Sequence, residues 1–277
     1  MPTLDRLGDR LRAADARQER LLVVYLTLGD PLTDSLELAV AAATAGADVL
    51  ELGLPTPGTQ PRGADIASSF DRARQCPPGR LWELVRKLRA RLPGTPLLSL
   101  VYPQTVADVG VDRLLELSAE SGVDGLVLTD PDGQLTPSQV AAAGLSAVPL
   151  VRPGTDAARR RRLEDSARHL TYQALAERTG VRLDPAQVGR SAEAAALGAT
   201  KPFLAGFGIR DEHDIRAVAA YAAGVVIGSE LYRGLAAAEP ATRVAWTEAA
   251  VRRWKAATRH SGTGLSGSEL PGSEHAR

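Results

Sequence analysis

The sequence predicts a mixed α/β fold, a (β/α)8 TIM barrel preceded by one extra N-terminal helix. Two observations lead to this prediction: eight short β-like runs alternate with alanine-rich helical stretches, and several of those runs are almost continuously apolar. Such alternation is typical of parallel strands joined by helices, and unbroken apolar strands are typical of sheets closed into a barrel or covered on both faces. The 277 residues, 44% of them hydrophobic, suit one large domain, which we place at residues 1–260.

Each strand is expected where leucine, valine and isoleucine gather between turn-forming residues. The expected strands, in chain order, are residues 21–27, 47–52, 96–101, 125–129, 148–151, 170–174, 202–205 and 224–227. Apolar residues at helical spacing predict helices between them, at residues 33–45, 81–92, 111–121, 157–167 and 212–219. An amphipathic segment at 4–17 is expected to close the bottom of the barrel, and a last helix is expected at 242–258. Residues 261–277 begin rich in serine and glycine and are expected to form a disordered tail.

Charge and cysteine content exclude several classes of protein. The 33 basic and 33 acidic residues balance, so neither nucleic acid nor a membrane surface is favoured as a partner. The single cysteine, Cys76, excludes an internal disulfide framework and a cysteine-rich zinc site. No stretch is apolar for long enough to span a bilayer, and the N-terminus lacks the apolar core of a signal peptide. We therefore expect a cytoplasmic protein.

Glu51 is the residue that most strongly indicates a catalytic role, because it places a carboxyl group inside the apolar strand expected at 47–52. Burial disfavours the ionised form, so it would raise the pKa of Glu51 toward neutrality, where a carboxyl group can donate and accept protons. Glu51 is therefore a candidate general acid/base. A glutamate at a strand end that pairs with an arginine would explain the same pattern, and the segment alone leaves both interpretations open.

Other informative residues also fall at the ends of expected strands, which is where TIM barrels carry their active sites. Tyr102 and Asp130 follow the third and fourth strands, while the glycine-containing loops 206–208 and 228–229 follow the seventh and eighth. Glycines let backbone amides approach an anion, and the helix expected after residue 228 supplies oriented donors. The two loops together predict a phosphate site, although a glycine after a strand can also serve a simple turn.

Several segments, in order along the chain, resemble the tryptophan synthase alpha subunit family. The matching segments are residues 25–31, 45–55, 206–209 and 228–229, with further matches at 122–131 and 178–181. The resemblance covers most of residues 20–235. It implies a lyase that splits indole-3-glycerol phosphate into indole and glyceraldehyde 3-phosphate by retro-aldol cleavage, without a metal or organic cofactor. It also implies a beta-type subunit as a possible partner.

The resemblance implies roles for individual residues. Glu51 becomes the proton-transferring carboxylate, and a second carboxylate is expected to contact the indole N–H. The implied phosphate ligands are Gly180, Phe207, Gly208, Gly228 and Ser229, with Arg182 or Arg210 as possible additions. The residues implied to contact the rest of the substrate are Tyr25, Tyr102, Tyr172 and Arg62. For Tyr102, Tyr172 and Phe207, packing inside the barrel is the better default explanation.

The chain departs from the family in the loop after the second strand, where Arg62 occupies the position of the second catalytic aspartate. A cation there opposes the positive charge that develops on the indole ring. We therefore expect Asp65, three residues later, to serve as the second catalytic residue, although its position also suits the cap of a helix that begins near Ile66. A second departure places Leu183 where the family has a glycine near the phosphate.

Three functions remain compatible with these residues. The first is an indole-producing lyase that uses Glu51 and Asp65. The second is a divergent barrel enzyme that keeps Glu51 and the phosphate loops but acts on another phosphorylated substrate, with Arg62 binding an anionic group. The third is a non-catalytic subunit that modulates a beta-type partner.

Overall fold

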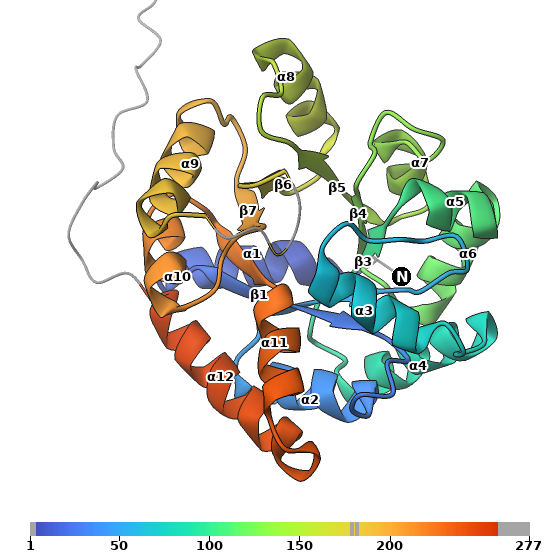
Figure 1. Cartoon of the computed structure of the whole chain (residues 1–277). Helices are drawn as coiled ribbons and strands as arrows, with labels where there is room; N and C mark the ends of the chain where they lie inside the picture. The colour runs from blue at the N-terminus through green and yellow to red at the C-terminus, as the bar shows by residue number, and fades with distance from the viewer. Residues whose placement is uncertain (1–3, 178–179, 181–182, 260–277) are drawn as a thin grey trace, which may run out of the picture.

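The computed structural model of the chain describes residues 4–177, 180 and 183–259, which form a closed barrel. Eight parallel strands pair in chain order, and β8 pairs back onto β1 to close the sheet. Figure 1 shows the helices arranged around this barrel. The predicted TIM barrel is therefore confirmed. The strands are β1 (Leu21–Thr27), β2 (Val49–Gly53), β3 (Leu97–Val101), β4 (Gly125–Leu128), β5 (Ser146–Val151), β6 (Thr171–Ala174), β7 (Phe203–Gly206) and β8 (Gly224–Ile227).

All residues of these strands are buried, because one face of each strand lines the barrel interior and the other lies under helices. The helices are α1 (Arg6–Ala16), α2 (Ser35–Ala45), α3 (Ala64–Ala73), α4 (Pro78–Arg91), α5 (Pro103–Val109), α6 (Val111–Ser121), α7 (Pro137–Ala142), α8 (Ala157–Ser166), α9 (Pro185–Leu197), α10 (Glu212–Ala219), α11 (Ser229–Ala237) and α12 (Arg243–Ala257). A short 3-10 turn, Pro240–Thr242, precedes α12.

Sequence periodicity did not reveal α5, α7 and α9. The first two have only 7 and 6 residues, too few to establish a helical period, and α9 is rich in alanine, so it lacks a marked apolar stripe. All three begin with proline at the first helical position, where its fixed φ and missing N–H are tolerated. Their start signals were present in the sequence, but their periodicity was not.

Helix α1 closes the N-terminal end of the barrel, as expected. Arg6 forms an ion pair with Asp124, which lies just before β4, with 2.9 Å between Nη1 and Oδ1. Asp5, the residue before α1, has its Oδ1 atom 2.8 Å from Nε2 of His169, which lies two residues before β6. In Figure 1 this helix lies behind the barrel. Because one end is closed in this way, the opposite end, formed by the C-terminal ends of the strands, is the open mouth.

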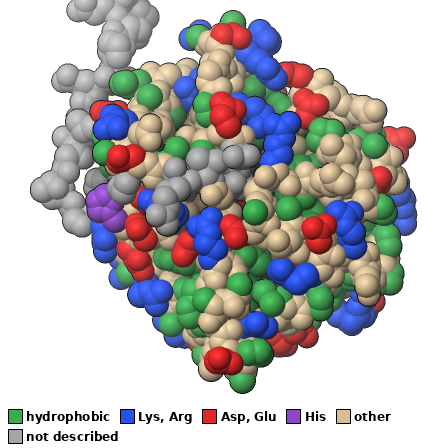
Figure 2. Space-filling view, viewed as in Figure 1, with side chains coloured by type: hydrophobic (Ala, Val, Ile, Leu, Met, Phe, Trp, Pro, Cys, Tyr) green, Lys and Arg blue, Asp and Glu red, His purple; other side chains and the backbone are tan. Residues whose placement is uncertain are grey.

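No helix within residues 4–177 and 183–259 is both long and apolar enough to cross a membrane. Figure 2 shows acidic and basic side chains intermixed over the displayed face. The tail expected at 261–277 lies outside the described residues.

Candidate active site

Glu51 lies at the centre of β2 with its side chain directed into the barrel, in register with Tyr25 of β1. The residue is only 2% exposed, and its Oε1 atom has no hydrogen-bond partner among the described residues. Because burial penalises the carboxylate, the pKa of Glu51 rises to about 8. Glu51 is therefore protonated at neutral pH, and its acid and carboxylate forms interconvert near physiological pH. This is the condition for general acid/base chemistry.

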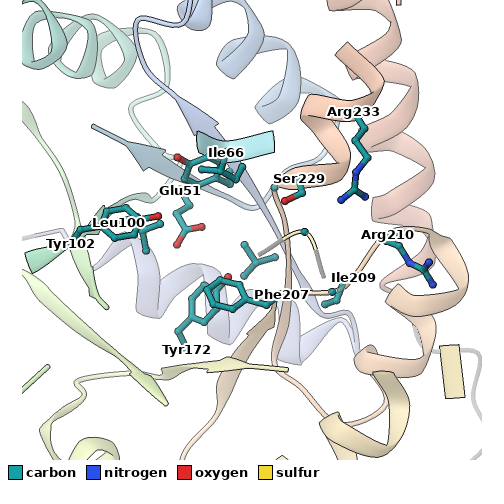
Figure 3. A pocket seen from close by; sticks show the side chains of 15 residues that line it. Glu51, Ile66, Leu100, Tyr102, Tyr172, Phe207, Ile209, Arg210, Ser229 and Arg233 are labelled. Carbon is teal, nitrogen blue, oxygen red and sulfur yellow. The ribbon is translucent and has the colours of Figure 1, made fainter. Parts of the chain in front are cut away.

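Three tyrosines, Tyr25, Tyr102 and Tyr172, line the same pocket as Glu51. Burial of each hydroxyl raises its pKa above the ordinary value, and the nearby Glu51 charge raises it further. The three phenols therefore remain neutral. In Figure 3 the Glu51 carboxylate is directed into the space between Tyr102 and the Tyr172–Phe207 side of the pocket. The carboxyl group thus has an aromatic, weakly polar environment.

Two glycines make room for these rings. A Cβ atom on Gly53 would collide with the hydroxyl of Tyr25, and one on Gly206 would collide with the hydroxyl of Tyr172. Each glycine is the last residue of its strand, β2 or β7, so the phenol ends of both tyrosines lie at the barrel mouth. Strand-end glycine is therefore a packing requirement of this pocket.

The opposite side of the pocket has the features of an anion site. Gly208 and Gly228 line it together with Ser229, the first residue of α11, and no side chain caps this helix. Phe207 and Gly208 both have left-handed backbones, with φ of 69° and 93°. For Phe207 this conformation is strained, as is common where a loop is shaped for a ligand. The exposed N-terminus of α11 offers N–H donors and a favourable dipole to a phosphate group.

Asp65 lies at this end, where it pairs with Arg233 of α11 across 2.9 Å, between Oδ2 and Nη2. It does not line the pocket with Glu51. Arg233 lines the pocket and also pairs with Glu230, at 3.0 Å. Gly180 completes the corner: a Cβ placed on it would be 3.6 to 3.7 Å from Asp65, Arg233 and Ser229. The alternative role of Asp65 as a helix cap is wrong, because α3 begins at Ala64 and Asp65 lies in its first turn without a capping bond.

Arg62 lies on the other side of the barrel mouth, in a second chamber that adjoins the first. Leu100, Tyr102 and Phe207 line both chambers, so the two chambers share a wall. The outer chamber also contains Arg152, from the loop after β5. The cavity volume of the inner chamber is about 40 Å³, and that of the outer one is about 290 Å³.

Comparison with known proteins decides the family. The model of the family described as "Tryptophan synthase alpha chain" matches residues 11–259 of this sequence. The chain belongs to the tryptophan synthase alpha chain family. Family membership classes the chain with the carbon–carbon lyases, because that is the reaction class of its homologues.

Individual members of the tryptophan synthase alpha chain family match over most of their length. The protein from Halorhodospira halophila is 33% identical over 83% of this chain and 87% of its own. The protein from Laribacter hongkongensis is 34% identical over 85% and 92%. The crystal structure of the alpha chain from Legionella pneumophila superimposes with a TM-score of 0.80 at 25% identity, covering 95% of this chain and all of that one.

The sequence analysis did not identify two arginines that line the chambers: Arg233 in the inner one and Arg152 in the outer one. Arg233 could have been found, because it lies four residues after Ser229, one helical turn into α11. Arg152 directly follows β5, at a strand end. Arg182 lies outside the described residues. Arg210 lines the pocket, but its guanidinium is held by Asp214 and the carbonyl of Leu183.

Within the described parts of the chain, one cluster has the side-chain types of a metal site: Asp211, His213 and Asp214 at the start of α10. Its carboxylates already have other partners. Asp211 caps the helix by accepting from the backbone N–H groups of His213 and Asp214, and Asp214 accepts from Arg210. None of the three lines the pocket of Glu51. A helix N-terminus also disfavours a cation.

Proposed function

We propose that this chain cleaves indole-3-glycerol phosphate to indole and glyceraldehyde 3-phosphate by a retro-aldol reaction. One observation carries the proposal: the buried carboxyl of Glu51, with a pKa of about 8 and an unpartnered oxygen, lines the same pocket as the glycine loops and the N-terminus of α11. A proton-transferring group and an anion site therefore face one space. This combination suits a substrate that carries a phosphate near the bond to be broken.

Glu51 would act first as an acid and then as a base. Its protonated form donates a proton to C3 of the indole ring, which places positive charge on the ring. The C3–C1′ bond of the glycerol side chain then breaks, its electrons neutralise the ring, and the C1′ hydroxyl loses its proton as the aldehyde forms. The Glu51 carboxylate accepts that proton. The residue ends the cycle as it began, so no outside acid, base or oxidant is required.

We assign the phosphate group to the loops after β7 and β8. The backbone amides around Gly208 and those at the start of α11, with the Ser229 hydroxyl, provide donors, and Arg233 provides positive charge at the same end. Gly180 and Phe207 shape that end. Asp65, which the sequence suggested as a second catalytic carboxylate, faces Arg233, so we assign it the role of positioning that guanidinium.

A second candidate function, cleavage of a related phosphorylated substrate, is favoured by Arg62 in the adjoining chamber. Arg62 occupies the position of the family's second catalytic aspartate, and its cation opposes the positive charge that develops on an indole ring. An arginine there therefore suits a different ring better than unsubstituted indole. A beta-type subunit is the partner that we propose from family membership. The function is therefore to be assayed with and without such a subunit.

The test is release of the two products from indole-3-glycerol phosphate by the purified chain. Equal amounts of indole and glyceraldehyde 3-phosphate are expected. If neither product forms, with or without a beta-type subunit, the proposed reaction is refuted.

A further inference from the structure

The outer chamber, lined by Arg62 and Arg152, has a cavity volume of about 290 Å³ and is not used by the steps above. It adjoins the chamber of Glu51, and Tyr102 and Phe207 line both. Two amide side chains, Gln60 and Gln104, also line it. Leu100, Leu150 and Phe207 form an apolar part of the wall, so the chamber offers an aromatic ring apolar contacts beside guanidinium and amide groups.

The proposed function, on which this inference rests, determines which part of the substrate enters this chamber. The phosphate lies at the Gly208 and Ser229 end, and the reacting ring carbon must be within reach of Glu51. The ring and the phosphate are at opposite ends of a three-carbon chain. The ring therefore extends away from the phosphate end, between Tyr102 and Phe207, and its far edge points into the outer chamber.

The two arginines in this chamber are available to a ligand. Among the described residues, neither has a carboxylate oxygen within 4.0 Å. Arg152 Nη2 donates to the carbonyl of Thr129 at 3.1 Å, which holds that guanidinium at the end of β4 and leaves its other N–H groups unassigned. Arg62 approaches from the loop between β2 and α3. The two cations thus enter from different sides of the barrel mouth.

Two carboxylates, those of Asp130 and Glu177, line the same chamber, and all four charged residues are exposed. The side chain of Asp130 lies against Gly133, three residues later: its Oδ2 atom is 2.7 Å from the position that a Cβ atom on Gly133 would occupy. Glu177 is exposed at the rim. The formal charges of these two carboxylates and the two arginines sum to zero, so selectivity for an anionic group must come from where the cations lie.

We propose that the ring of the natural substrate carries an anionic substituent, of which a carboxylate is the simplest, and that Arg62 and Arg152 bind it. A planar carboxylate matches the paired N–H groups of a guanidinium. The substituent also removes the electrostatic conflict at Arg62, because its negative charge offsets the cation that would otherwise oppose positive charge on the protonated ring. The chain would then be a lyase for a ring-carboxylated indole glycerol phosphate or a closely similar aromatic.

The test is equilibrium binding of the ring alone, measured by calorimetry. The probes are indoles that carry a carboxylate at each position of the benzene ring, and the matching carboxamides, which have nearly the same shape without the charge. The proteins are the wild type, Arg62→Gln, Arg152→Gln and a control, Arg252→Gln. Arg252 is an exposed arginine of α12 that pairs with Glu248 on its own helix and does not line either chamber.

At least one carboxylate is expected to bind the wild type about tenfold more tightly than its carboxamide, a difference of about 1.4 kcal/mol. Arg62→Gln and Arg152→Gln should each abolish most of that preference, and Arg252→Gln should leave it unchanged. The inference is overturned if no carboxylate is preferred, or if the preference survives in both chamber variants.

This readout does not depend on turnover. If the chain releases indole from unsubstituted substrate but shows no preference for the carboxylate, the proposed reaction stands and this inference is refuted. If the chain prefers the carboxylate but releases no indole, this inference stands and indole-3-glycerol phosphate is refuted as the substrate.

Discussion

The carboxylate of Asp65 and the guanidinium of Arg233 lie 2.9 Å apart and join the first turn of α3 to α11 at the end of the pocket that we assign to phosphate. The side chains are 28% and 37% exposed, so the pair is partly screened by solvent. Its position decides between two roles for Asp65. A positioning residue for Arg233 affects how tightly phosphate binds, whereas a second proton-transfer group would affect the chemical step.

Asp65→Asn is therefore expected to weaken substrate binding more than turnover. Loss of the ion pair frees Arg233 to take other rotamers, so KM should rise about three- to tenfold, equivalent to about 1 kcal/mol, while kcat stays within about twofold. Steady-state kinetics check this. Glu248→Gln, which breaks an exposed pair on α12, serves as the control. A fall in kcat of a hundredfold or more with unchanged KM would instead make Asp65 a catalytic group.

Gly53→Ala is expected to destabilise the fold and disturb the pocket. The new methyl group would collide with the hydroxyl of Tyr25 and lie 3.0 Å from a ring carbon of Phe70. Overpacking of this kind costs about 1–3 kcal/mol, so the midpoint of thermal unfolding should fall by several degrees.

Gly79→Ala provides the matched control for that substitution. Gly79 lies in the first turn of α4 with no atom within 4 Å of the new methyl group, so alanine should be neutral or stabilise by up to about 1 kcal/mol. Equal effects of the two substitutions on the unfolding midpoint would contradict the close packing of Tyr25 on Gly53.

Glu51 is expected to make the free energy of unfolding depend on pH. Its pKa is about 8 in the folded protein and near the ordinary value of 4.5 when unfolded. Between these values the folded state holds a proton that the unfolded state has lost, so Glu51 lowers stability progressively as pH rises from 4.5 to about 8. Glu51→Gln removes that penalty. As the pH rises from 4.5 to about 8, the free energy of unfolding of the variant, measured by urea unfolding, should therefore increase by a few kcal/mol relative to that of the wild type. A constant difference between the two proteins across this range would contradict the raised pKa.

The sequence made the barrel and one half of the site predictable, because both depend on local pattern. Eight apolar runs predict the strands, and Glu51 is recognisable as a charged residue within one of them. The two glycine loops fall at strand ends, so their meeting with Glu51 follows from barrel topology alone.

The other half of the site depends on pairings between distant segments, which no local pattern reports. Asp65 seemed free to replace the missing aspartate because its partner, Arg233, is far along the chain and joins it only when α3 and α11 pack side by side. Arg152 and Arg62 likewise share a chamber only because β2 and β5 are strands of one closed barrel. The direction in which each side chain points is decided by such contacts.

The most direct test of the account compares indole release by wild type and Glu51→Gln, with affinity for glycerol 3-phosphate measured in parallel. Glutamine keeps the shape of the side chain but cannot transfer a proton, so kcat should fall by at least about a hundredfold while glycerol 3-phosphate binds as before. Retention of most of the wild-type kcat in Glu51→Gln would contradict the claim that Glu51 carries the proton.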